Sequence, residues 1–289
     1  VSWQRTYSPR NDSKGIVSEV EHLVVFSKNP GWQPNKLPRT EAMDSRYKNP
    51  DNDVAPWKSS DAFAPGAATH QGMVYAIQHP FTGEMLYPSN GRCWRYQQSS
   101  MLEYMQGWCN YRLENLHDEK ERARVCGIDE SAVRKDVLAI VLEEPLEVSA
   151  AKAQKVYNRG RWPGFYFTKG GYGGIARKTY LENVGGRLPT NLWMYEETGH
   201  TDEAKKELIS LFGGRSPFDT PKPTRLLDFV LKVAGTSETL MLDSFAGSGT
   251  TAHAVLNANK ADNGNRHFIL IEMMDYADSI TAERVKRVI

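Results

Sequence analysis

The sequence has little of several features that would fix its class directly. It has only three cysteines, Cys93, Cys109 and Cys126, and they share no Cys-x-x-Cys spacing, so we interpret them as ordinary buried or surface thiols. No histidine lies at metal-ligand spacing from a cysteine or an acid, and we predict no metal site. No apolar run approaches membrane-spanning length and no signal peptide is visible, so we expect a cytoplasmic protein that does not contact a membrane.

The sequence also lacks an excess of charge of either sign. The formal net charge of the 289 residues is +1, so composition alone does not indicate a nucleic-acid-binding protein. Any DNA-binding face must therefore come from local clustering of cations. With 40% hydrophobic residues the chain can bury a sizeable core, and one large or two smaller domains are expected.

Both ends of the sequence lack the features of a natural terminus. The chain begins at Val1 rather than at a methionine, and it stops at Ile289 within a predicted helix over residues 277–289. We therefore expect a segment of a longer protein.

The most informative stretch is a predicted strand, tight turn and helix. An apolar run over residues 240–243 ends in Asp243, the turn contains Gly247 and Gly249, and residues 252–258 are typical of a helix. Glycines let the backbone approach a ligand closely, and the helix N-terminus offers free amide N–H groups. The unit predicts a site for a cofactor that carries phosphate or carboxylate.

A second buried strand over residues 266–272 is closed by Glu272. An acid at this position in a doubly wound sheet is placed to accept hydrogen bonds from ribose hydroxyls, so the two strands together predict a cofactor that contains adenosine. A phosphate-binding loop of nucleotide triphosphatases would need a lysine after Gly249, where the chain has two threonines. Nucleotide hydrolysis is therefore not expected.

The charge of Asp243 narrows the choice of cofactor. Gly247-Ser-Gly249-Thr-Thr-Ala252 fits the dinucleotide pattern, which is a weak signal by itself. The carboxylate of Asp243 would repel a pyrophosphate but attract the ammonium group of an amino acid. S-adenosylmethionine fits this pattern better than a dinucleotide does.

These motifs carry a family resemblance. Asp243-x-Phe245-x-Gly247-Ser-Gly249-Thr-Thr is similar to the cofactor motif of DNA amino-methyltransferases. Together with the preceding run Phe218-Asp-Thr-Pro-Lys222-Pro, it resembles the modification (Mod) subunit of type III restriction-modification systems. That family methylates the exocyclic amine of adenine in a specific DNA sequence. The match is specific over residues 1–27 and 187–289 and looser between them.

The resemblance implies an α/β fold with a doubly wound S-adenosylmethionine-dependent methyltransferase sheet, permuted in motif order and incomplete, into which an α+β target-recognition region is inserted. We expect residues 1–27 to hold the C-terminal strands of the catalytic region, residues 28–200 to form the target-recognition region, and residues 201–289 to form the half that binds S-adenosylmethionine. The implied partners are double-stranded DNA, a second Mod copy and a helicase-nuclease (Res) subunit.

The resemblance also implies roles for single residues. Phe245 would pack on the adenine ring, the two glycines would shape the turn, Asp243 would face the methionine end and Glu272 would hold the ribose. A predicted helix over residues 223–233 would line the methionine end of the pocket. The expected cofactor-binding residues are Asp219, Thr220, Lys222, Asp243, Phe245, Gly247, Gly249, Thr250 and Glu272.

Two stretches are candidates for DNA contact because they combine cations with aromatic residues. A predicted hairpin over residues 73–96 ends with Arg92, Trp94 and Arg95; the alternative is a strand with a buried Trp94 and solvated arginines. A glycine-rich stretch over residues 159–174 contains Arg161 and Lys169, and its alternative is a loop that closes the core of its own domain.

The remaining stretches are assigned to secondary structure only. We predict a strand over residues 21–27, no regular helix or central strand in the proline-rich residues 29–66, two helices within 98–136, a strand over 137–148, a short helix over 149–157 and a helix over 201–212. The polar residues 8–15 are predicted to form a loop, which the family resemblance would place near the target base; the alternative is an ordinary polar connector.

One expected motif is absent. The family's Asp-Pro-Pro-Tyr tetrapeptide, which holds the flipped adenine, does not occur, and Asn29-Pro-Gly-Trp32 lacks the second proline and follows the wrong strand. We therefore assign no catalytic residue, and expect the chain alone to be poorly soluble and catalytically inactive. A DNA-binding module with a vestigial cofactor fold and a dinucleotide-dependent oxidoreductase remain the alternatives.

Overall fold

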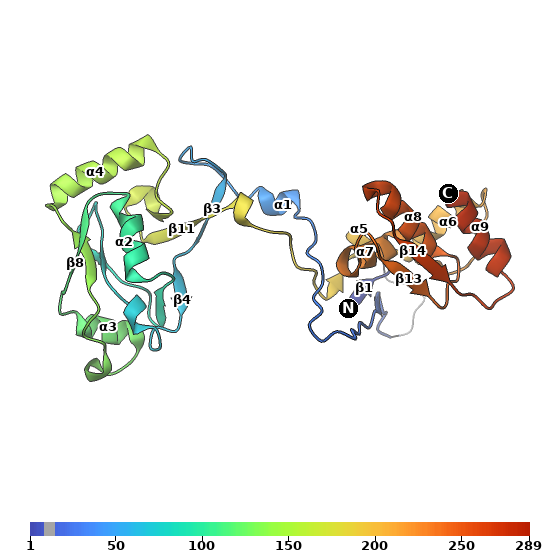
Figure 1. Ribbon diagram of the computed structural model, residues 1–289, viewed down its shortest axis with the longest axis horizontal. Helices are drawn as coiled ribbons and strands as arrows, with labels where there is room; N and C mark the ends of the chain where they lie inside the picture. Colours follow the sequence, from blue (N-terminus) through green and yellow to red (C-terminus); the bar gives the residue numbers. More distant parts are fainter. Residues whose placement is uncertain (9–14) are drawn as a thin grey trace. The chain divides into compact units, whose positions relative to one another are not determined.

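The computed structural model describes residues 1–8 and 15–289 and divides into two compact units (Figure 1). The terminal unit combines Val1–Arg39 with Gly186–Ile289, so the two ends of the chain fold together. The central unit is Thr40–Gly185. The inserted target-recognition region was expected at residues 28–200, and the functions assigned to these parts of the chain stay predictions.

The terminal unit contains the predicted strand, turn, helix and strand. Strands β13 (Leu240–Asp243) and β14 (His267–Leu270) are parallel and are connected through helix α8 (Thr250–Asp262). One side chain from each strand, Met241 and Phe268, packs against a core that α7 (Thr224–Ala234) and α8 share. Alternate residues of a strand point to opposite faces, so one face of this small sheet is covered by helices.

The other face of β13 and β14 carries apolar side chains that lie open. Leu240 and Leu242 are 61% and 62% exposed, and Ile269 and Ile271 are 48% and 52% exposed. The four side chains are aliphatic and alternate with the covered positions. Within the described residues, this face of the sheet has no covering layer.

A second small sheet of the terminal unit has the strand order β12-β1-β2. It consists of β12 (Leu192–Trp193), β1 (Ser2–Gln4) and β2 (Val20–His22), with β1 parallel to β12 and antiparallel to β2. The predicted strand over residues 21–27 is right only at its start, because β2 ends at His22 and, among the described residues, pairs only with β1. Beyond β2, Val24 and Phe26 are 74% and 89% exposed.

The helices of the terminal unit follow the sequence pattern closely. The structure has α5 (Tyr195–Thr198), α6 (Thr201–Leu211), α7, and a final helix that starts as a π-helical segment, η5 (Ala277–Ala282), and continues as α9 (Glu283–Val288). The predictions over residues 201–212, 223–233 and 277–289 are confirmed. As far as the structure describes it, the unit is thus mixed α/β with two small sheets.

The central unit is also mixed α/β. Its strands form three sheets with the orders β6-β5-β9-β8, β10-β11-β3 and β4-β7. The strands are β3 (Trp57–Asp61), β4 (Phe63–Pro65), β5 (Ile77–Gln78), β6 (Met85–Leu86), β7 (Arg92–Trp94), β8 (Tyr111–Glu114), β9 (Ala139–Leu142), β10 (Phe165–Phe167) and β11 (Ile175–Tyr180). The helices are α1 (Glu41–Asp44), α2 (Gln98–Gln106), α3 (Glu119–Cys126) and α4 (Leu146–Arg159), and short 3-10 turns lie between elements.

The core of the central unit is rich in aromatic residues whose polar atoms are paired. Trp94 and Trp108 are each 1% exposed, and their indole N–H groups donate to the carbonyls of Tyr75 (2.8 Å) and Phe165 (2.9 Å). Buried polar groups cost free energy unless they are hydrogen-bonded. These two bonds therefore let large indole rings fill the core without an unpaired donor.

Several sequence predictions for this unit are confirmed and others need correction. Helices α2 and α3 confirm two helices within 98–136, but the strand β8 between them was missed. The hairpin of residues 73–96 exists as β5 and β6, whereas β7 pairs with β4 instead. In the proline-rich stretch, β3 and β4 lie at sheet edges, as expected for β4, which ends in Pro65, and α1 is a single turn.

A buried histidine makes the stability of this unit depend on pH. His79 is 1% exposed; its Nδ1 accepts the N–H groups of Phe81 and Thr82, and its Nε2 lies 3.2 Å from the carbonyl of Gly173. The ring is therefore neutral, and burial lowers the pKa of His79. As the pH falls below about 6.5, His79 becomes protonated in the unfolded chain but not in the folded one, and the free energy of unfolding therefore decreases.

We predict that the free energy of unfolding falls between pH 7.5 and pH 5.5, and that His79→Gln reduces this fall. Chemical denaturation at the two pH values measures both quantities. An equal fall in the parent chain and the variant would contradict the assignment.

Candidate functional site

The turn between β13 and α8 requires glycine at two positions. Gly247 and Gly249 have left-handed φ angles of +51° and +76°. A Cβ on Gly249 would lie 3.0 Å from the carbonyl oxygen of Thr281, and a Cβ on Gly247 would lie 3.3 Å from the ring of Phe218. Residues with a side chain rarely adopt this backbone conformation, and at these two positions a side chain would also lie very close to neighbouring atoms.

Two carboxylates hold the turn from its two sides. Asp243, at the end of β13, accepts the Phe245 N–H (3.2 Å) and the Thr251 hydroxyl (2.6 Å). Glu272, just beyond β14, accepts the N–H groups of Gly247 (2.8 Å) and Met274 (3.0 Å). The hydrogen bond from the Met274 N–H, and after it that from the Gly247 N–H, lowers the pKa of Glu272, so its carboxylate is charged at neutral pH.

Phe245 lies between these acids in the sequence and is 86% exposed. Large aromatic side chains are normally buried, so an open ring at the carboxyl edge of a parallel sheet has surface available for a flat ligand. The turn therefore combines two anionic side chains with an uncovered aromatic ring.

The segment over residues 218–222 lies next to the turn. Phe218 contacts Gly247 as described, and the Lys222 carbonyl accepts the Thr250 hydroxyl at 3.2 Å. The ammonium of Lys222 pairs with Glu21 on β2 at 2.7 Å and lies over the Trp3 ring. The N-terminal strands and the segment over residues 218–222 therefore lie together next to the turn, and the Lys222 ammonium is paired with Glu21.

Asp219 and Thr220 have a different environment. They line a cavity of about 640 Å³ whose wall also contains Tyr7 and His200, and this wall does not include Asp243 or Glu272. The structure thus places the expected cofactor-binding residues in two groups, one at the glycine turn and one in this cavity. The polar loop expected near the target base falls largely on residues 9–14, outside the described residues.

The expected role of the Thr250 side chain in cofactor binding needs a correction. The residue is 6% exposed; its hydroxyl donates to the Lys222 carbonyl and lies 3.0 Å from Nη1 of Arg284. Both contacts are with the interior of the protein. The hydroxyl therefore supports the turn and is not available to a cofactor.

Arg284 on α9 is a residue of this site that the sequence analysis missed. It is fully buried, and its guanidinium donates to Ser248 Oγ (3.1 Å), Thr250 Oγ1 (3.0 Å) and Glu207 Oε2 (2.9 Å). It also donates to Nδ1 of His253, whose pKa is lowered by burial. Nothing in the mixed-charge sequence of α9 distinguishes Arg284 from an exposed arginine, so no pattern could have found it.

The residues expected to contact DNA differ in how exposed their side chains are and in whether they are paired. Trp94 lies in the core, so the prediction that it contacts DNA is wrong and the alternative of a buried Trp94 holds. Arg92 pairs with Asp61 at 2.6 Å and lies over the Phe63 ring. Arg95, Arg161 and Lys169 are exposed, so contact by these three stays a prediction.

Other site types find no support within the described residues. No cluster of three or more His, Cys, Asp or Glu side chains is placed to hold a metal ion there. No helix of the described chain is both long and apolar enough to cross a bilayer. All three cysteines are buried, and burial raises the pKa of the Cys109 thiol to about 11.

A sequence profile of a family described as DNA methylase matches residues 1–283. The chain belongs to this DNA methylase family. Membership implies a methyl donor and decides against the oxidoreductase alternative.

Particular relatives narrow the class. The chain is 39% identical over 137 residues to the type III restriction-modification enzyme StyLTI Mod subunit of Salmonella typhimurium, covering 43% of this chain and 21% of the relative. It is 42% identical over 91 residues to the EcoPI Mod subunit of Escherichia phage P1 (30% and 14%), and 40% identical over 81 residues to the type II methyltransferase M.KpnI of Klebsiella pneumoniae (28% and 19%). The predicted resemblance to Mod subunits is confirmed, and the chain aligns with about a fifth or less of the length of these relatives.

The geometry of the turn predicts an asymmetry between two glycines with similar backbones. Gly213 has a φ of +74° and no atom within 4 Å of an added Cβ, whereas Gly249 has the Thr281 carbonyl at 3.0 Å. Gly213→Ala should lower the free energy of unfolding by about 1 kcal/mol, because alanine would have to adopt the left-handed backbone conformation but would meet no close neighbour. Gly249→Ala should cost about 2–4 kcal/mol because a close contact is added. Equal losses in chemical denaturation would contradict the assignment.

Proposed function

We propose that the chain is part of the modification subunit of a type III restriction-modification system, which transfers a methyl group from S-adenosylmethionine to the exocyclic amine of adenine in a specific DNA sequence. The observation that carries the proposal is the glycine turn, where Asp243 and Glu272 flank the exposed ring of Phe245. The membership in the DNA methylase family and the Mod relatives support it.

The chemistry of the turn fits this cofactor. S-adenosylmethionine carries an ammonium group, a ribose and a flat adenine ring, and it supplies an electrophilic methyl group. Each carboxylate oxygen can accept a further hydrogen bond beyond those it already has, so Asp243 can bind the ammonium and Glu272 the ribose hydroxyls, while Phe245 packs on the adenine. A pyrophosphate would meet like charge at both acids.

The finer description of the fold belongs to this proposal. We infer a doubly wound sheet, permuted and incomplete, to which β13 and β14 contribute, with a target-recognition region inserted into the chain. The open aliphatic face of Leu240, Leu242, Ile269 and Ile271 supports the inference, because an apolar sheet face normally packs against a second layer. The central unit, which covers residues 40–185, corresponds to most of the inserted region.

The substrate and partners follow from the same proposal. An adenine amine inside a duplex is not accessible, so the target base would be flipped out of the stack. The tetrapeptide that holds the flipped base in the family does not occur in the sequence, and we assign no catalytic residue. Double-stranded DNA, a second Mod copy and a Res subunit are the proposed partners.

Binding of S-adenosylmethionine should depend on the Asp243 carboxylate. Calorimetric titration should show binding to the parent chain that weakens at least about tenfold in Asp243→Ala, because an ion pair and a hydrogen bond to the ammonium are lost. Thr251→Val is the matched control, since it removes the same Thr251–Asp243 hydrogen bond but keeps the charge.

Equal affinities of the parent chain and Asp243→Ala would contradict the assigned role. DNA binding without any S-adenosylmethionine binding would favour a DNA-binding module with a vestigial cofactor fold.

We further predict that the 289-residue chain alone does not methylate adenine in duplex DNA, because no residue of its sequence supplies the tetrapeptide for the flipped base. Incorporation of labelled methyl groups into DNA measures this activity. Robust transfer by the purified chain would refute the prediction.

A further inference from the structure

One stretch of the central unit carries cations and no acids. Between Glu147 and Glu182 the sequence has no Asp or Glu, but it has seven Lys and Arg residues. Lys152 pairs with Glu144, and Lys178 pairs with Asp51 and Asp53. The other five make no ion pair with any residue that the structure describes; they are Lys155, Arg159, Arg161, Lys169 and Arg177.

Arg161 is held in an unfavourable backbone conformation. Its φ is +51°, in the left-handed region that residues other than glycine seldom adopt. Its backbone N–H donates to the Asp51 carbonyl at 2.7 Å. The preceding Gly160 approaches the same carbonyl so closely that a Cβ would lie 2.3 Å from the oxygen. The backbone of residues 160–161 is therefore held closely against the carbonyl of Asp51.

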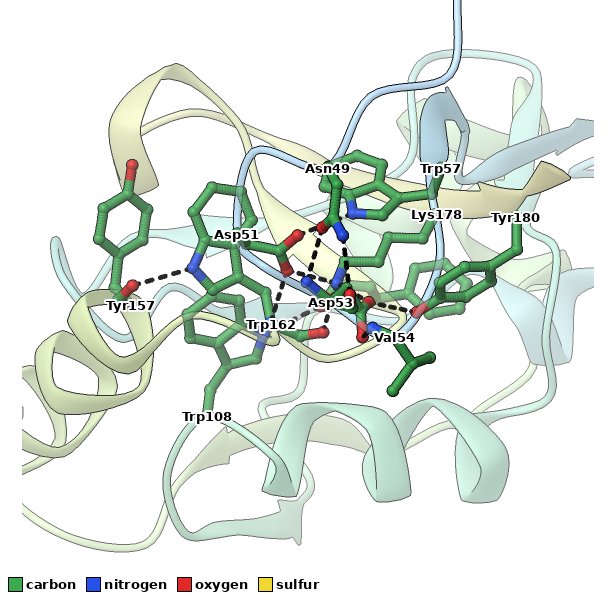
Figure 2. Close-up of polar contacts among 11 residues, drawn as sticks. Asn49, Asp51, Asp53, Val54, Trp57, Trp108, Tyr157, Trp162, Lys178 and Tyr180 are labelled. Carbon is green, nitrogen blue, oxygen red and sulfur yellow. Dashed lines mark hydrogen bonds and ion pairs between the residues drawn. The ribbon is translucent and has the colours of Figure 1, made fainter. Parts of the chain in front are cut away.

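A buried ionic network fixes this contact (Figure 2). Lys178 Nζ donates to Asp51 Oδ2 and Asp53 Oδ2, both at 2.5 Å, and to the Trp162 carbonyl at 2.7 Å. The Asp51 carboxylate in turn accepts the Trp162 N–H at 2.7 Å and the Trp57 indole N–H at 2.8 Å. The side chains of Lys178 and Asp51 are fully buried, and both backbone groups of Trp162 are bound by the network.

The second acid of the network is equally constrained. Asp53 accepts the Tyr180 hydroxyl at 2.6 Å, and the Asn49 side chain bonds both the N–H and the carbonyl of Asp53. Burial alone would raise the pKa of Asp53, but hydrogen bonds from Lys178 and Tyr180 outweigh it and lower the pKa. The residue stays charged, so the network persists at neutral pH.

The fold gives no reason for an arginine at position 161. Its side chain is exposed and makes no ion pair within the described chain, and a glycine would adopt the left-handed conformation at lower cost. Strained residues persist where the surroundings over-determine them, and they cluster at functional sites. A rigid loop that presents an unpaired guanidinium within an acid-free stretch is suited to bind an anion.

We infer that the loop of residues 159–162 is a preorganised contact for a DNA phosphate, made by Arg161, and that Lys178 with Asp51 and Asp53 positions it. The inference rests on the proposed function, which supplies DNA as the partner. Because the network fixes the loop before binding, little conformational entropy is lost when the guanidinium meets the phosphate.

The test compares Arg161→Gly with His117→Gly in the full chain. His117 is also exposed, with a left-handed φ of +51°, and lies in the same unit, so glycine relieves the same backbone strain at both positions. Neither variant should lower the melting temperature. Arg161→Gly should weaken binding to a mixed-sequence DNA duplex on the order of fivefold to tenfold at low salt and reduce the salt slope by about one, whereas His117→Gly should change neither.

Unchanged affinity and salt slope in Arg161→Gly would overturn the inference and leave the proposed function intact. A parent chain that binds S-adenosylmethionine but no DNA would overturn the inference together with the DNA part of the proposed function.

The positioning role of the network has its own readout. Asp51→Asn keeps one acid for Lys178 but removes a charged acceptor from the Trp162 N–H. If the network positions Arg161, this variant should weaken DNA binding, and Arg161→Ala should then cost less in Asp51→Asn than in the parent chain. Additive losses in the two variants would refute the positioning role, and Asp53→Asn provides the same comparison should Asp51→Asn fail to fold.

Discussion

The glycine turn of the terminal unit depends on two carboxylates that hold it from both sides. Asp243 is the last residue of β13 and Glu272 lies just beyond the adjacent parallel strand β14, and they accept the N–H groups of Phe245 and Gly247 on either side of Ala246. The turn is thereby fixed in a conformation that only glycine tolerates at two positions. The arrangement keeps negative charge at the carboxyl edge of the sheet and leaves Phe245 uncovered, which together favour a ligand with a cation and a flat ring.

A buried cation supports the candidate site in each unit. Arg284 binds the hydroxyls of Ser248 and Thr250 behind the glycine turn, and Lys178 binds the acids that hold the loop of Arg161. Removing one partner of a buried ion pair typically costs about 3–5 kcal/mol, so such pairs fix the position of what they contact even when they add little net stability. Each unit thus uses buried charge to hold the backbone of its exposed candidate site.

The sequence predicted those parts of the structure that depend on local pattern. The strand, turn and helix over residues 240–262 and the helices α6 and α7 were found because hydrophobic period, glycine and proline act locally. The strand over residues 21–27 was overextended because a strand needs a partner that sequence does not show. The burial of Thr250 and Arg284 was not predictable, because each depends on contacts with residues distant in the sequence, and for Trp94 the sequence left a buried side chain and a DNA contact both open.

The central claim is that the glycine turn binds S-adenosylmethionine. Ultraviolet cross-linking of methyl-labelled S-adenosylmethionine to the chain, followed by peptide mapping, tests it most directly. The account predicts label in the peptides that contain Phe245 or the adjoining Phe218, and loss of the label when unlabelled cofactor competes. Label confined to peptides of the central unit, or label that does not respond to competition, would contradict the account.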